Sequence, residues 1–122
     1  MKRILVIDDD MQMREMLRQV LERAGYEVED AADGKIGMNI QRQEPVDLVI
    51  TDLIMPEKEG IETIRELRRD FPQLKIVAIS GGGRISADGY LNVAKTIGAD
   101  QTFSKPFELK ELIGTVKDLL DS

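Results

Sequence analysis

Short apolar runs rich in β-branched residues alternate along this chain with stretches of helical apolar spacing. The runs at 4–7, 48–50 and 76–79 are apolar throughout, as expected of strands buried on both faces. The segment 26–29 instead alternates apolar and acidic residues, which indicates a half-exposed edge strand. A short last strand is predicted at 101–104. Strands separated by helices form a parallel sheet that is covered by helices on both faces.

Five helices are expected between and after these strands. The predicted segments are 13–24, 33–42, 61–71, 90–97 and 109–120. The apolar residues of each recur at helical spacing and so make one stripe. In the second helix, Ile36 and Ile40 are expected to face the core. Gly25 follows the first helix at the position where glycine commonly ends helices.

The edge-like strand also predicts the topology. Its place outside the sheet gives the strand order 2-1-3-4-5, so the first and third strands are neighbours at the topological switch point. Doubly wound sheets open a ligand crevice at that point. With no internal repeat or linker, residues 1–122 are expected to form one α/β domain with a five-stranded, doubly wound parallel sheet.

Acidic residues follow two of the buried strands directly. Asp8, Asp9 and Asp10 follow the first, Asp52 follows the third, and Ser80 ends the fourth. Parallel strands end at the same rim, so the acids are expected to crowd one crevice. Two carboxylates about 4 Å apart repel by roughly 4 kcal/mol at an effective dielectric near 20, and a hard divalent cation removes that repulsion. Mg²⁺, or Mn²⁺ in its place, is the expected cofactor.

A simpler interpretation is that the acids only cap helices and form turns. Aspartate is favoured at helix N-caps, and Asp10 is the best candidate for such a cap. Three consecutive acids and a fourth on a neighbouring strand are more than capping needs. Lys105, just after the last strand, is expected at the same rim, where its ammonium group could reach an anionic oxygen.

Composition excludes several classes of function. The chain contains neither cysteine nor histidine, which excludes disulfides, thiolate chemistry and a Ser-His-Asp triad. The net charge of −6 argues against nucleic-acid binding by this chain alone. No segment has the length of a membrane span or the pattern of a signal peptide, so no membrane association is expected and the cytoplasm is the expected compartment.

Taken in order, these elements resemble the receiver domain of two-component response regulators. The matching segments are ILVIDDD (4–10), LVITDLIMP (48–56), IVAISG (76–81), GAD (98–100) and FSKPF (103–107). They cover the chain from end to end, and the resemblance is to stand-alone, chemotaxis-regulator-like members. The natural-looking start and end of the chain favour a stand-alone regulator.

The resemblance implies a role for each site residue. Asp52 would be the phosphoacceptor, converted to an aspartyl phosphate by a partner's phosphohistidine. Asp9 and Asp52 would bind Mg²⁺ directly with the backbone carbonyl of Ile54, and Asp8 would act through a metal-bound water. Lys105 would pair with the phosphoryl group.

Further residues would respond to the phosphoryl group. Ser80 would hydrogen-bond one of its oxygens, Phe103 would be the aromatic switch residue, and the bond before Pro106 would be cis. The surface of the fourth helix, fifth strand and fifth helix would then signal to a downstream protein target. A histidine kinase or histidine phosphotransfer protein would dock near the first helix and the Lys105 loop.

The resemblance also implies that the chain is not a turnover enzyme. It would promote its own phosphorylation and lose the phosphoryl group slowly, because neither Ile54 nor Gly82 carries a polar side chain that could orient an attacking water.

Alternatives remain open at this point. A haloacid-dehalogenase-type phosphatase would use Asp8 as its nucleophile, although the chain is short for that family. The second alternative is an interaction module that does not depend on phosphorylation. A flavin binder would need a phosphate loop after the first strand, where three acids would repel the phosphate.

Overall fold

The computed structural model describes residues 1–53, 60–80, 95 and 98–121. Five parallel strands form one sheet in the order β2-β1-β3-β4-β5. The strands are β1 (Arg3–Ile7), β2 (Glu27–Ala31), β3 (Leu48–Asp52), β4 (Lys75–Ser80) and β5 (Gln101–Ser104). The predicted fold class and strand order are confirmed, and β2 is the edge strand that its alternating pattern indicates.

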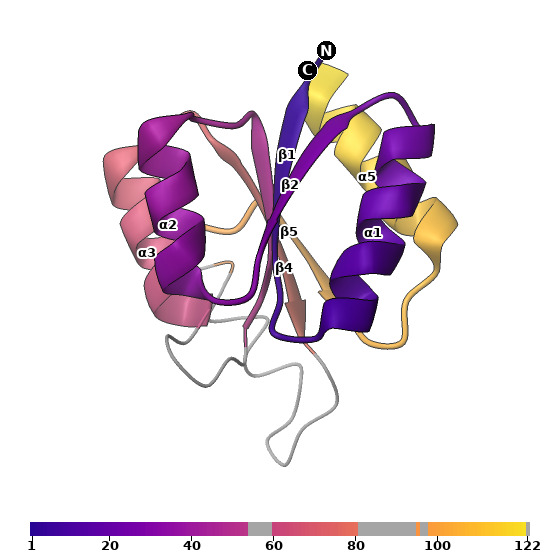
Figure 1. Ribbon diagram of the computed structural model, residues 1–122, viewed down its shortest axis with the longest axis horizontal. Helices are drawn as coiled ribbons and strands as arrows, with labels where there is room; N and C mark the ends of the chain where they lie inside the picture. Colours follow the sequence, from indigo (N-terminus) through magenta and orange to yellow (C-terminus); the bar gives the residue numbers. More distant parts are fainter. Residues whose placement is uncertain (54–59, 81–94, 96–97, 122) are drawn as a thin grey trace.

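Helices cover both faces of the sheet. They are α1 (Met11–Arg23), α2 (Gly34–Gln43), α3 (Gly60–Asp70) and α5 (Leu109–Asp121). Helices α1 and α5 lie on one face, and α2 and α3 lie on the other (Figure 1). The helix predicted at 90–97 lies outside the described residues, apart from Lys95. No helix in the described part of the chain is long and apolar enough to cross a membrane.

Strand β1 separates two hydrophobic cores. Leu5 and Ile7 point to the core that α2 and α3 complete, whereas Ile4 and Val6 point to the core of α1 and α5. None of the four side chains is accessible to solvent. Alternate residues of a strand face opposite sides of a sheet. An uninterrupted apolar run is therefore what a strand with helices on both faces requires.

Helix α1 begins and ends where local signals predict. The Asp10 side chain accepts hydrogen bonds from the backbone N–H groups of Gln12 and Met13, at 2.9 and 3.4 Å, which satisfies donors that the helix leaves free. After the helix, Gly25 adopts φ of 101°, a conformation that favours glycine. The prediction that Asp10 is a cap is confirmed.

The prediction for Ile36 is wrong, because this side chain is 45% exposed. The buried side of α2 carries Gly37, Met38 and Gln41. A Cβ at Gly37 would lie 2.8 Å from Cγ1 of Ile7, so α2 lies very close to β1 at this point. This close approach orients the helix, and Ile36 consequently faces solvent.

Candidate functional site

The ends of β1 and β3 bring three acids together. Ile7 and Thr51 are partners in the parallel register, so Asp8 and Asp52 follow at the same level of the sheet. One carboxylate oxygen from each of Asp8, Asp9 and Asp52 lies within 4.8 Å of the others. Asp8 and Asp52 are buried, and Asp9 is exposed. The predicted acid cluster therefore forms, with one side open to solvent.

Lys105 lies over the two buried acids. Its Nζ is 3.2 Å from Oδ2 of Asp52 and 3.5 Å from Oδ2 of Asp8. The backbone N–H of Lys105 donates to the carbonyl oxygen of Ser80 at 2.8 Å, which holds the loop after β5 against the end of β4. The peptide bond between Lys105 and Pro106 is cis. The ammonium group thus occupies the place at the rim that the sequence predicts.

Burial and neighbouring charges alter the acidity of this group of side chains. Burial raises the pKa of Asp8 to about 6, and the negative charge of Asp52 adds to the rise. The N–H of Asp10 and the charge of Lys105 act in the opposite direction. Burial alone would lower the pKa of Lys105, but the charges of Asp52 and Asp8 outweigh it and the pKa is raised. Lys105 therefore stays charged, and its charge only partly offsets the rise in the pKa of Asp8.

Arg14 is a site residue that the sequence did not reveal. Its Nη1 donates to the backbone carbonyl of Asp8 at 2.7 Å, and its Nε lies 3.5 Å from Asp30 of β2. The N–H of Asp8 donates in turn to the carbonyl of Ala31 at 3.1 Å. Helical side chains point back toward the helix N-terminus, so a basic residue one turn after Asp10 was the available signal.

Ser80 and Phe103 lie near the same rim. Ser80, at the end of β4, is fully buried. Phe103 of β5 is the register partner of Ile79, and its ring centroid lies 5.8 Å from that of Phe107. Phe103 also packs against the core between the sheet and α1 and α5. Ile54 and Gly82 lie outside the described residues, so the predictions that rest on them are untested.

The acid cluster has the donors that a hard divalent cation requires. Its potential ligands are all oxygen atoms, and they come from two neighbouring strand ends. Mg²⁺ commonly binds one or two protein carboxylates and keeps several waters, for which the exposed side at Asp9 leaves access. The residues present therefore fit Mg²⁺.

The fold and the site together define a class of protein. It is a doubly wound α/β domain with an acidic crevice over which a lysine lies. The family model for the response regulator receiver domain matches residues 4–117. The chain is 37% identical over 120 residues to the response regulator receiver protein CpdR of Brucella abortus, covering 98% of each. It is 38% identical to the response regulator MprA of Mycolicibacterium vanbaalenii but spans only 50% of that protein's length.

Solved structures of receiver domains and response regulators are also similar to this chain. A receiver domain from Clostridium thermocellum superimposes with a TM-score of 0.91 at 27% identity, covering 99% of this chain and 95% of that one. The response regulator TrrA from Thermotoga maritima, solved in complex with Mg²⁺ and BeF, gives 0.87 at 33% identity, covering 98% and 100%.

The chain belongs to the response regulator receiver domain family. Members of this family are signalling modules of two-component systems, which agrees with the expectation that the chain is not a turnover enzyme. The comparisons do not favour the dehalogenase-type phosphatase or the phosphorylation-independent module.

Proposed function

We propose that Asp52 is the phosphoacceptor of a receiver domain that covers residues 1–122. The observation that carries this proposal is the convergence of Asp8, Asp9 and Asp52 within 4.8 Å beneath Lys105. A carboxylate of Asp52 attacks the phosphorus of a partner's phosphohistidine, and the P–N bond breaks. The electron pair stays on the imidazole, which takes up a proton, and Asp52 becomes an acyl phosphate.

Asp9 and Asp52 would hold Mg²⁺ directly with the backbone carbonyl of Ile54, and Asp8 would hold it through a water. When bound, the ion supplies positive charge that offsets the charge developing on the transferred phosphoryl group. Mn²⁺ would serve in the same site, since carboxylate and water ligands suit both ions.

Lys105, Ser80 and Phe103 respond to the new phosphoryl group. Lys105 already pairs with Asp52 at 3.2 Å, so an anionic phosphoryl oxygen at that place keeps its charge partnered. Ser80 donates a hydrogen bond to another phosphoryl oxygen. Because Phe103 lies beside Ile79 in the register, it follows the movement of the β4 end through packing.

A hollow beside Lys105 supports the proposed docking of a phosphodonor. Its volume is about 410 Å³, and its lining residues are Met13, Met16, Lys105, Pro106 and Phe107. Methionine side chains adapt to different apolar partners. A histidine kinase or histidine phosphotransfer protein that placed an apolar side chain here would bring its phosphohistidine close to Asp52.

After phosphorylation, the surface of the fourth helix, β5 and α5 contacts a downstream protein. The cytoplasm is the proposed compartment.

Chemical trapping tests the proposal. The purified chain would be incubated with acetyl phosphate and Mg²⁺ and then reduced with borohydride, which converts an aspartyl phosphate to homoserine. Peptide mass spectrometry should find homoserine at position 52 only. Asp52→Asn should abolish the label, whereas Asp118→Asn, an exposed change on α5, should not. Label at Asp8 would support the phosphatase, and no label would support an interaction module.

Slow loss of the phosphoryl group is part of the proposal. Neither Ile54 nor Gly82 can position a water by a side-chain hydrogen bond. The lifetime of the phosphorylated chain in Mg²⁺, followed by ³¹P NMR after removal of the donor, is expected to be long. A lifetime of seconds would contradict this part and leave the assignment of Asp52 intact.

A further inference from the structure

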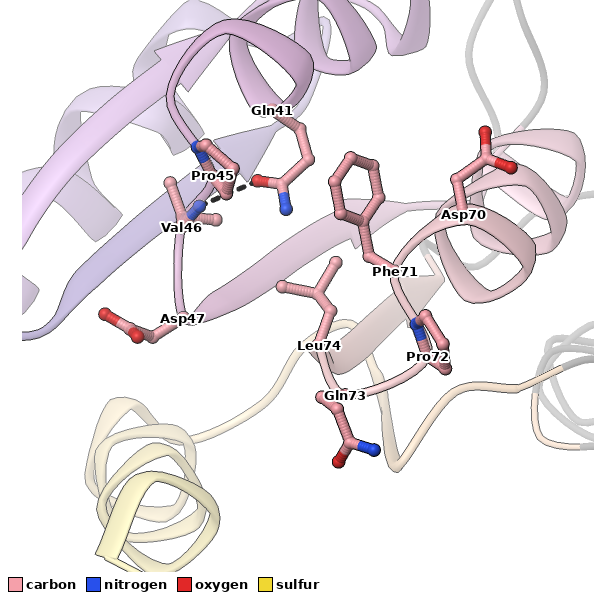
Figure 2. Close-up of a pocket in the computed structure, with 9 residues that line it drawn as sticks. All are labelled: Gln41, Pro45, Val46, Asp47, Asp70, Phe71, Pro72, Gln73 and Leu74. Atoms are coloured by element: carbon pink, nitrogen blue, oxygen red, sulfur yellow. Dashed lines mark hydrogen bonds between the residues drawn. The ribbon is translucent and has the colours of Figure 1, made fainter.

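A second hollow lies at the opposite end of the sheet from the acids. It has a volume of about 370 Å³ and sits where β3 and β4 begin, between the loops that follow α2 and α3. Its lining residues are Gln41, Pro45, Val46, Asp47, Asp70, Phe71, Pro72, Gln73 and Leu74. We call it the Gln41 pocket (Figure 2). The apolar side chains of Phe71 and Leu74 form one wall of this pocket.

The orientation of the Gln41 amide is determined by its neighbour. The N–H of Val46 donates to Oε1 of Gln41 at 2.8 Å. A backbone N–H can only donate, so the carbonyl end of the side chain must face Val46. The NH₂ group then points the other way, toward the space beside Phe71 and Leu74 (Figure 2).

This NH₂ group has unused hydrogen-bonding capacity. Gln41 is only 1% exposed, and within the described part of the chain its side-chain nitrogen makes no hydrogen bond. Among the side chains that the structure describes, only Nε of Arg3 is both shielded from solvent and without a partner, so the NH₂ group of Gln41 is reached by solvent from the pocket. A ligand that offers an acceptor inside the pocket would take the place of that solvent at the donor.

The acids at the rim do not select a charged ligand. Asp70 is paired with Arg42 at 2.7 Å and with Arg69 at 2.9 Å, and Asp47 accepts the N–H of Arg3 at 2.8 Å. Both carboxylates point away from the centre of the pocket in Figure 2. Recognition inside the pocket is therefore left to apolar contact and to the Gln41 donors.

From these observations we propose that the Gln41 pocket binds a small uncharged molecule with an apolar group and a carbonyl acceptor. The apolar group would pack on Phe71 and Leu74, and the carbonyl oxygen would accept from Gln41. This pocket is separate from the proposed phosphorylation site. The pocket lies where β3 begins and Asp52 lies where β3 ends, and a strand extends by about 3.3 Å per residue.

Titration of the isotopically labelled chain with N-isobutylacetamide tests the proposal. In ¹H–¹⁵N and methyl spectra, the side-chain NH₂ signals of Gln41 and the methyl signals of Leu74 are expected to shift together and to saturate. Methyl shifts without a Gln41 shift would show apolar contact alone and would overturn the proposal. No saturable shift up to the solubility limit would also overturn it.

The variant Gln41→Glu removes the NH₂ donor while keeping an oxygen that can accept from Val46. At pH 8 the carboxylate can still accept from Val46, but it presents an acceptor to the ligand in place of the NH₂ donors. Binding should weaken at least about fivefold, the loss expected for one hydrogen bond. Gln43→Glu is the matched control, because Gln43 is an exposed residue of the same helix, α2, and does not line the pocket. If the two variants bind the amide equally well, Gln41 does not recognise it; if Gln41→Glu fails to fold, the wild-type titration decides.

Discussion

Nη1 of Arg14 donates a 2.7 Å hydrogen bond to the backbone carbonyl of Asp8. A side chain of α1 thereby holds the loop that carries two of the clustered acids. The same guanidinium group lies 3.5 Å from Asp30 on β2, so it joins the helix, the loop and the edge strand. The geometry of the acid cluster therefore depends on a residue that contributes no metal ligand.

Replacing Arg14 should weaken Mg²⁺ binding without preventing folding. Arg14→Gln removes the charge and shortens the reach to the Asp8 carbonyl, so the loop loses an anchor worth about 1–2 kcal/mol. Isothermal calorimetry should show several-fold weaker Mg²⁺ binding. Arg18→Gln is the matched control, because Arg18 pairs with the same Asp30 at 2.7 Å and, within the described part of the chain, makes no hydrogen bond or ion pair with the Asp8 loop. Equal effects of the two variants would contradict the anchoring role.

Lys105 should stabilise the metal-free protein. Lys105→Met leaves the buried carboxylates of Asp8 and Asp52 without their shared cation, and the free energy of unfolding at pH 8 in EDTA should fall by about 1–3 kcal/mol. Urea denaturation measures the change. Saturating Mg²⁺ should restore much of the loss, since the ion replaces the missing positive charge. A loss that Mg²⁺ leaves unchanged would mean that Lys105 acts mainly through packing.

The pKa of Asp8 predicts how stability depends on pH. This pKa is about 6 in the folded protein and about 3.9 in an unfolded chain. Between these values the folded state binds more protons, so the free energy of unfolding should decrease as pH rises from about 4 to 6, by up to about 3 kcal/mol. Asp8→Asn should remove this contribution in metal-free denaturation curves. Parallel pH profiles for the two proteins would refute the assignment.

Mg²⁺ should raise the melting temperature. An ion that binds only the folded state stabilises it by about 1.4 kcal/mol at ten times its Kd, which corresponds to several degrees for a domain of this size. Scanning calorimetry at millimolar MgCl₂ measures the shift, and Asp52→Asn should reduce it. An unchanged melting temperature would contradict the interpretation of the acids as a cation site.

Two helical glycines should respond oppositely to alanine. Gly114→Ala on α5 should stabilise the protein by about 0.5–1 kcal/mol, because a Cβ there meets nothing within 4 Å. Gly37→Ala should destabilise it by about 1–3 kcal/mol, because the new Cβ overlaps the buried side chain of Ile7. Thermal unfolding of both variants is the measurement. Stabilisation by both would show that α2 can shift away from β1.

Local patterns in the sequence determined the secondary structure and, through it, the rim at which the acids meet. Continuous apolar runs predict strands covered on both faces, and the alternating run predicts the edge strand β2. Asp10 as a cap and Gly25 after the helix are also local signals. Such features can be predicted from the sequence because helix capping and the spacing of buried residues depend on residues close together in the chain.

Only the tertiary structure decided which side chains meet across elements. The exposure of Ile36 follows from the close approach of α2 to Ile7, and the contact of Arg14 with the Asp8 carbonyl follows from how α1 sits on the sheet. The raised pKa of Asp8 and the inward-facing NH₂ of Gln41 likewise require packed neighbours. These properties depend on distances and burial that packing sets, and the sequence pattern of a single element carries neither.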